Sequence, residues 1–206
     1  MQNSPLHPDT IAIQSGREDL ARLGVHALPI DLSTTYSLPD IEHGGNSYEA
    51  MATGGNPDPA GGMVYQRLWN PTAARLEHAV ARLQHAAAPV ACSSGMAAMT
   101  AAILAFTRPL GHSHVVAVRP LYGGTDHLLD AGLLGVDVTF CDEAGVAASI
   151  RDDTGLVIVE SPGNPTLDLI DISSVALQAA GVPLLVDNTF ATPILQNPID
   201  LGAALV

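Results

Sequence analysis

The chain has 206 residues, 47% of them hydrophobic, and a formal net charge of −13 at pH 7. This composition suffices for one sizeable core and excludes disorder for most of the chain, while the negative charge would repel a nucleic-acid backbone. All 8 basic residues are arginine, and the absence of lysine excludes a Walker-type phosphate loop and any Schiff base formed by this chain alone.

The first sixty-odd residues are rich in turn formers and end in a glycine- and proline-rich run at 54–62. Proline lacks a backbone N–H and glycine loses much entropy on ordering, so this run works against regular structure. We therefore predict an extended N-terminal arm with a flexible loop over residues 1–62. A second, larger domain is predicted over residues 63–206.

A helix is predicted after the arm. Asn70 can cap it and Pro71 suits its first position, because the proline N–H would have no helical partner there. Apolar residues then recur at helical spacing on one face, at Leu76, Val80 and Leu83. We expect this helix to end near Ala87.

Short strand-like runs alternate with helix-length segments beyond this helix, at residues 89–92, 115–118, 136–140, 156–159 and 184–186. Four runs are apolar on both faces, which is typical of a parallel sheet covered by helices on each side. Asp137 and Thr139 make the third run alternate, so it should be an edge strand. Residues 203–206 look like the opening of another buried strand, from which we expect the chain to be incomplete.

The two cysteines, Cys92 and Cys141, each lie at the end of a strand-like run. Two cysteines are too few for a disulfide framework, and free cysteine is among the most often buried residue types. We predict that both are buried core thiols. No secretion signal or membrane-length apolar run is found, so a cytoplasmic protein is expected.

Two candidate ligand sites follow the first two runs, where open α/β sheets bind ligands. Ser94, Gly95 and Met96 open a helix whose amides could bind a phosphate, although serine is also an ordinary helix cap. Tyr122 follows the second run and offers a flat ring for stacking and a hydroxyl for proton transfer. It could equally pack under the adjoining glycine turn.

Two more candidates follow the fourth and fifth runs. Asn164 lies between prolines in a loop that would hold its amide rigidly, or that is simply a proline turn. Asp187 places a carboxylate at the end of a buried strand, where it could act either as a cap or as a functional group. It needs a hydrogen-bonding or cationic partner, because an unpaired carboxylate there would be costly.

Together these four candidates meet the requirements of pyridoxal 5'-phosphate (PLP). Its phosphate must be anchored, its ring held flat, its phenolic oxygen hydrogen-bonded, and its pyridine nitrogen kept protonated by a carboxylate. The combination is more specific than any one of its members.

Five segments resemble, in the same order, those of the PLP-dependent trans-sulfuration enzymes, such as cystathionine γ-lyase, methionine γ-lyase and cystathionine γ-synthase. They are residues 65–72, 94–96, 121–125, 160–165 and 186–193. The resemblance spans about residues 11–206, roughly half of a family member. It implies the PLP-dependent transferase fold of type I, with a mainly parallel seven-stranded sheet between helices and with the C-terminal domain absent from this sequence.

The resemblance also implies roles for single residues. Gly95 and Met96 would offer amides to the phosphate with Ser94 beside them. Tyr122 would stack on the pyridine ring and deprotonate the substrate amine, and Asp187 would pair with the pyridine nitrogen.

Three further residues receive roles in the same way. Asn164 would lie near the phenolic oxygen. Tyr65 and Arg67 would reach from one subunit into the neighbouring subunit's site and bind the phosphate there. The resemblance therefore implies a homodimer with shared active sites, and usually a tetramer of two such dimers.

The implied reaction is carbon–sulfur bond elimination from a sulfur amino acid through a quinonoid intermediate, and γ-replacement by a thiol is the alternative within the family. The family's Schiff-base lysine would lie roughly five residues past Val206, about one strand's length. Gly124 stands where methionine γ-lyases typically have cysteine, which weakens that subclass.

Two other classes of protein lack support in the sequence. A nucleotide-binding module would need a G-x-G-x-x-G motif after the first strand, which is missing. A metal enzyme could use His112 and His114, or His78 and His85, but no H-E-x-x-H motif or cysteine pair accompanies them. We therefore predict no metal site.

Overall fold

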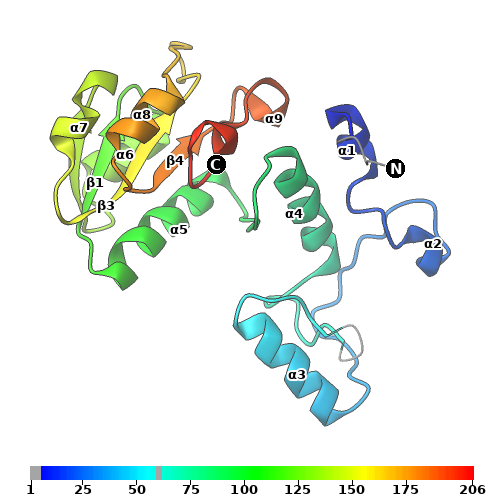
Figure 1. Ribbon diagram of the computed structural model, residues 1–206. Coiled ribbons are helices and arrows are strands. Elements are labelled where there is room, and N and C mark those ends of the chain that lie inside the picture. The colour runs from blue at the N-terminus through cyan, green and yellow to red at the C-terminus, as the bar shows by residue number, and fades with distance from the viewer. Residues whose placement is uncertain (1–5, 59–61) are drawn as a thin grey trace. The chain divides into compact units, whose positions relative to one another are not determined.

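The computed structural model describes residues 6–58 and 62–206, so part of the predicted loop at 54–62 lies outside the described residues. The chain divides into two compact units. Unit 1 comprises residues 1–82 and 88–91, and unit 2 comprises residues 83–87 and 92–206. Figure 1 labels most of their helices and strands. The sequence predicts a boundary at residue 62, between an arm that contributes to the neighbouring subunit's site and the larger domain, and this boundary stays a prediction.

Unit 1 adds helices to the arm that the sequence predicted as extended. They are α1 (Pro8–Gln14), α2 (Leu20–Leu23) and α3 (Ile41–Ala52). Asp40 caps α3, since its Oδ1 accepts a hydrogen bond from the His43 amide at 2.8 Å. Gly44 and Gly45 lie inside α3, and glycine is a poor helix former, so propensity alone does not reveal this helix.

Helix α4 (Pro71–Leu83) begins where the sequence predicts. The Asn70 Oδ1 accepts hydrogen bonds from the amides of Thr72 at 2.9 Å and Ala73 at 3.1 Å, which is the expected cap. The helix ends four residues before Ala87, at Leu83, and His85 adopts a left-handed backbone with φ of 55°. A helix cannot continue through that conformation.

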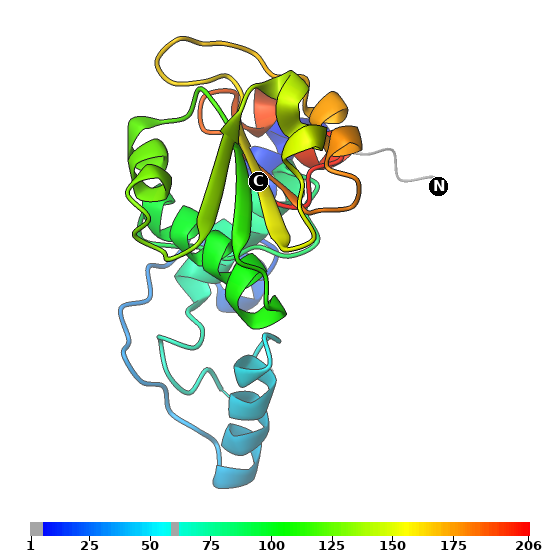
Figure 2. The same cartoon turned by 90° about the vertical axis from the view of Figure 1, so that its left-hand side faces the viewer.

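Unit 2 contains a parallel sheet of β1 (His114–Val118), β2 (Asp137–Cys141), β3 (Thr154–Glu160) and β4 (Leu184–Asp187). Their order is β2-β1-β3-β4, and Figure 2 shows β2, β1 and β3 side by side. The four corresponding sequence predictions agree within two residues at each end. Strand β2 lies at an edge, as its alternating polar residues predicted.

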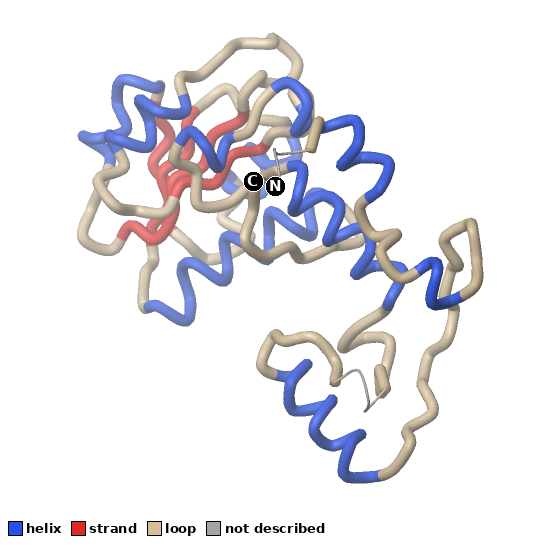
Figure 3. The backbone as a smooth tube through the Cα atoms, turned by 45° about the vertical axis from the view of Figure 1, so that its right-hand side comes forward, coloured by secondary structure: helices blue, strands red, loops and turns tan. Residues whose placement is uncertain are grey.

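Helices cover both faces of this sheet, and Figure 3 shows the strands in red between them. One face packs on α5 (Gly95–Thr107) and α6 (Gly123–Asp130), and the other on α7 (Val146–Ser149) and α8 (Ile172–Gln178). The remaining elements are α9 (Thr192–Leu195) and three short 3-10 helices at Arg108–Leu110, Glu143–Gly145 and Pro198–Leu201. This layered α/β architecture confirms the predicted fold class, with four strands of the sheet in the described residues.

The strand predicted at residues 89–92 is wrong. In this described segment the chain forms no strand, and Val90 is exposed. The Ala91 amide donates to Glu77 Oε1 at 2.7 Å rather than to a strand partner. Proline at the start of the run lacks a donor and alanine has low strand propensity, so a run this short is not held in a sheet by its own preferences.

The prediction of two buried thiols also fails in part. Cys92 is exposed, because the strand that was to bury it does not form, whereas Cys141 at the end of β2 is partly buried. Burial raises the pKa of the Cys141 thiol. Residues 203–206 pair with β4 through a single parallel bridge between Leu205 and Leu185, and only Ala203 among them is buried.

Candidate functional site

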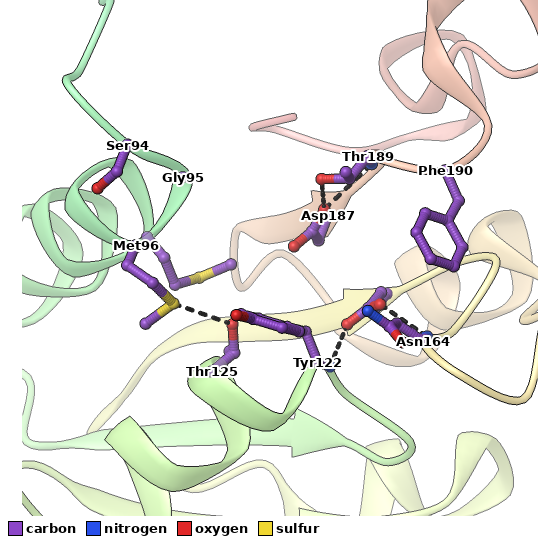
Figure 4. A pocket seen from close by; sticks show the side chains of 11 residues that line it. Ser94, Gly95, Met96, Tyr122, Thr125, Asn164, Asp187, Thr189 and Phe190 are labelled. Atoms are coloured by element: carbon purple, nitrogen blue, oxygen red, sulfur yellow. Dashed lines mark hydrogen bonds between the residues drawn. The ribbon is translucent and has the colours of Figure 1, made fainter.

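A cavity of about 360 Å³ opens at the carboxyl ends of β1, β3 and β4 in unit 2. Its size lies in the roughly 300–1,000 Å³ range of small-molecule sites. Six of the eight residues that the sequence singled out line it: Ser94, Gly95, Met96, Tyr122, Asn164 and Asp187. Figure 4 shows how these residues surround the cavity from different elements. Parallel strands bring their carboxyl ends to one edge, which explains the convergence.

The N-terminus of α5 leaves two backbone amides free at the cavity. Ser94 caps the helix, because its Oγ accepts a hydrogen bond from the Ala97 amide at 3.1 Å. In the described part of the chain, no hydrogen bond uses the amides of Gly95 or Met96. A Cβ added to Gly95 would meet no atom within 4 Å. Free amides beside open space at a helix N-terminus suit an anion.

Tyr122 presents its ring to the cavity. The side chain is 45% exposed, so the ring is not buried beneath the glycine turn. It lies over Gly124, where an added Cβ would be 2.5 Å from the ring's Cε1 atom. Gly124 therefore permits this placement of the ring, and an aromatic face is available for stacking (Figure 4).

Asp187 ends β4 and has one oxygen available. Its Oδ1 accepts hydrogen bonds from the Thr189 amide at 3.1 Å and from the Thr189 hydroxyl at 2.5 Å. Among the described residues, no group donates to its Oδ2. The sequence predicted a cationic or hydrogen-bonding partner for this carboxylate without naming it, and in the structure that partner is Thr189. One oxygen holds the turn, and the other is free to accept a proton-bearing nitrogen.

Glu160 is a site residue that the sequence reasoning missed. It ends β3, is only 5% exposed and lines the cavity. Its Oε1 accepts a hydrogen bond from the Asn164 amide at 2.8 Å, and its Oε2 accepts one from the Tyr122 amide. Burial and the nearby charge of Asp187 raise the pKa of its carboxyl group. The available signal was a carboxylate at the end of an apolar strand.

Smaller contributions to the cavity also escaped the sequence analysis. They come from Met99, Thr125, Thr189 and Phe190. The Thr125 hydroxyl lies 3.9 Å from the Met96 sulfur and links α6 to α5 (Figure 4). None of the four was assigned a role in the site from the sequence, although Thr125, Thr189 and Phe190 lie in segments that resemble the family.

Tyr65 and Arg67 lie in unit 1 rather than in the unit that contains the cavity. The Arg67 Cζ atom is 5.3 Å from the centre of the Tyr65 ring, so the guanidinium and the ring are close enough for a cation–π contact. This pairing keeps the two side chains together. Their role in a neighbouring subunit's site stays a prediction.

A sequence model of the family described as "Cys/Met metabolism PLP-dependent enzyme" matches residues 9–206. The chain belongs to this family. The match confirms the resemblance that the five segments indicated, and the family is PLP-dependent. The groups at the cavity fit PLP, since two free amides beside open space suit its phosphate, Tyr122 suits its ring, and the free oxygen of Asp187 suits a protonated pyridine nitrogen.

Relatives within the family have named activities. The chain is 57% identical over 201 residues to an L-methionine gamma-lyase of Brevibacterium aurantiacum, covering 98% of this chain and 49% of that enzyme. It is 38% identical to a homocysteine synthase of Schizosaccharomyces pombe, over 97% of this chain and 46% of that enzyme. The chain therefore spans about half the length of the curated relatives it matches.

Solved structures of relatives superpose on most of the chain. A metB protein from Corynebacterium glutamicum matches with a TM-score of 0.81 at 35% identity, over 96% of this chain and 49% of that one. A cystathionine gamma lyase, CalE6, from Micromonospora echinospora matches with a TM-score of 0.78 at 35% identity, over 97% of this chain and 49% of that one. These matches support the fold class that the sequence predicted.

Proposed function

We propose that the enzyme containing this chain is a PLP-dependent carbon–sulfur lyase that acts on a sulfur amino acid, with L-methionine as the first candidate. The observation that carries the proposal is that Asp187 and the free amides of α5 line one cavity together with the exposed ring of Tyr122. The relatives at 56–57% identity are named L-methionine gamma-lyases. Their similarity over nearly the whole chain outweighs the single difference at Gly124, where methionine γ-lyases typically have cysteine.

The chain's own residues would hold the cofactor and set its charge. The amides of Gly95 and Met96 would bind the phosphate, and Tyr122 would stack on the ring and take a proton from the substrate amine. The side-chain amide of Asn164 would lie near the phenolic oxygen. The free oxygen of Asp187 would accept the proton-bearing pyridine nitrogen. Bound PLP supplies an electron sink for loss of the substrate's α-proton and sulfur group.

The remaining parts of the site are proposed to come from elsewhere. We propose a dimer in which Tyr65 and Arg67 of each subunit bind the phosphate in its partner, and a tetramer of two such dimers. Because the chain contains no lysine, the amine that binds PLP covalently must be supplied from outside these 206 residues. In the described residues no helix could cross a bilayer, and a cytoplasmic location stays a prediction.

Product analysis tests this proposal. The protein, expressed with whatever residues its gene encodes beyond Val206, is supplied with PLP and either L-methionine or L-cystathionine. We expect ammonia and 2-oxobutanoate to be released. Formation of a thioether from an acylated homoserine and a thiol, without release of these products, would instead assign γ-replacement. No turnover of any of these substrates would contradict both reactions.

A further inference from the structure

Glu160 connects the two loops that carry Tyr122 and Asn164. Tyr122 follows β1 and Asn164 follows β3. The two residues are 42 positions apart in the sequence (164 − 122). Each oxygen of the Glu160 carboxylate accepts one backbone amide, Oε1 from Asn164 and Oε2 from Tyr122. One side chain therefore binds the backbone of both loops at the edge of the cavity.

This arrangement is costly for the fold alone. Glu160 is 5% exposed, and no arginine or histidine in the described residues forms an ion pair with its carboxylate. In the parallel register of β3 and β4, Glu160 pairs with Asp187, a second carboxylate. Burial and like charge both disfavour ionisation, and they raise the pKa of Glu160. An apolar residue at this position would avoid these costs.

We propose that Glu160 is a positioning residue, which holds the backbones of Tyr122 and Asn164 so that both side chains face the same bound cofactor. The proposal rests on the proposed function for what the two side chains contact. Asn164 and Tyr122 approach PLP from different loops, so without the carboxylate each loop could shift independently. Loss of the bridge should then affect cofactor geometry more than the stability of the sheet.

Hydrogen exchange tests the bridge without any cofactor. In Glu160→Gln, the backbone amide of either Tyr122 or Asn164 would face the glutamine NH2 group instead of an acceptor. In Glu160→Asp the charge is kept, but the side chain is too short to reach both loops. We expect segments containing Tyr122 and Asn164 to exchange about tenfold faster in both variants, because hydrogen bonds to charged groups are lost. Glu143→Gln is the matched control, since Glu143 accepts the Asp171 amide at 3.3 Å outside the cavity.

Cofactor binding tests the positioning role. The protein is expressed with whatever residues its gene encodes beyond Val206, and PLP affinity and the visible circular dichroism of bound PLP are measured. We expect Glu160→Gln to weaken PLP binding about tenfold and to alter the dichroism. In a Tyr122→Ala background the same substitution should weaken PLP binding by less than about threefold. The effects of two residues that act together are not additive.

The outcomes separate this proposal from the proposed function. If the unsubstituted protein does not bind PLP, the proposed function fails, while hydrogen exchange still shows whether Glu160 holds the two loops. If PLP binds normally to both Glu160 variants, or if the losses with Tyr122→Ala are additive, the positioning role is overturned and the cofactor site stands. Failure of both variants to fold would also overturn it, since Glu160 would then be a folding requirement.

Discussion

Asp187 keeps one carboxylate oxygen without a donor at the end of β4, and the proposed contact to the cofactor depends on that oxygen. The other oxygen is held by Thr189, which fixes the orientation of the carboxylate. A substitution that preserves shape and removes charge therefore isolates the electrostatic role. The neighbouring Glu160 differs in that each of its oxygens accepts a backbone amide.

We expect Asp187→Asn to weaken PLP binding and lower turnover by about 10- to 100-fold, since a hydrogen bond to a charged group is worth about 1.5–3 kcal/mol. The neutral amide cannot stabilise a protonated pyridine nitrogen. Equilibrium dialysis with PLP measures the first effect. Asp152→Asn, on the surface of unit 2, should bind PLP like the unsubstituted protein. Equal affinities for the Asp187 and Asp152 variants would contradict the assignment.

His114 is a buried residue of β1 whose ring lies between two hydroxyl groups. Its Nδ1 is 2.8 Å from the Thr154 hydroxyl, and its Nε2 is 2.8 Å from the Thr139 hydroxyl. Thr154 already accepts the Arg151 amide at 2.8 Å, so its own proton is free to bind Nδ1. The neutral ring with its proton on Nε2 satisfies both contacts. Burial accordingly lowers the pKa of His114.

This lowered pKa predicts a pH dependence of stability. Above about pH 6.5, the ordinary histidine value, both folded and unfolded states hold His114 neutral and it contributes no slope. Below that pH the unfolded state binds the proton first, so the free energy of unfolding should fall as the pH decreases. Urea unfolding of the native chain and of His114→Gln between pH 8 and 5 measures this. Identical slopes in the two proteins would refute the prediction.

At the level of elements, α5 connects the core to the site. Its buried face packs on the sheet through Met99 and Ile103, while its first residues provide the free amides at the cavity. This helix, with its serine cap, was apparent in the sequence. Its position relative to Asp187 was not, because that depends on how β3 and β4 pair.

We expect Ile103→Ala to lower the free energy of unfolding by about 2–5 kcal/mol, because the side chain is 0% exposed and its loss leaves a cavity. Ile103→Val should cost about 0.5–1.5 kcal/mol. Ile194→Ala serves as the control, since Ile194 in α9 is exposed, and it should change stability by less than about 0.5 kcal/mol. Denaturant unfolding measures all three. A similar loss in Ile103→Ala and Ile194→Ala would contradict the packing described.

The elements differ in how well local pattern predicted them. Strands β1, β3 and β4 were found because apolar residues occupy both faces, and β2 because Asp137 and Thr139 alternate with apolar ones. Helix α3 was missed because Gly44 and Gly45 weaken its helical propensity. The strand at residues 89–92 was predicted from a short apolar run, and no pairing partner exists for it among the described residues.

At the level of the whole molecule, the proposed dimer predicts complementation between variants. Arg67→Ala and Asp187→Asn should each have strongly lowered activity alone. If Arg67 serves the partner's site, dimers formed from one chain of each kind contain one intact site. Refolding an equal mixture should then restore about a quarter of the native activity, because about half of the dimers are mixed. Activity no greater than the sum of the separate variants would contradict sharing of the site.

The class of sheet, the cap of α4 and the residue types that PLP requires could be predicted from the sequence, since these depend on periodicity and on chemistry carried by neighbouring residues. The three-dimensional structure was needed to show that Ser94, Tyr122, Asn164 and Asp187 line one cavity and that Glu160 binds two loops. The exposure of Cys92 likewise became known from the structure. These features depend on strand pairing, which brings together residues far apart in the chain, and local preferences do not encode which strands become neighbours.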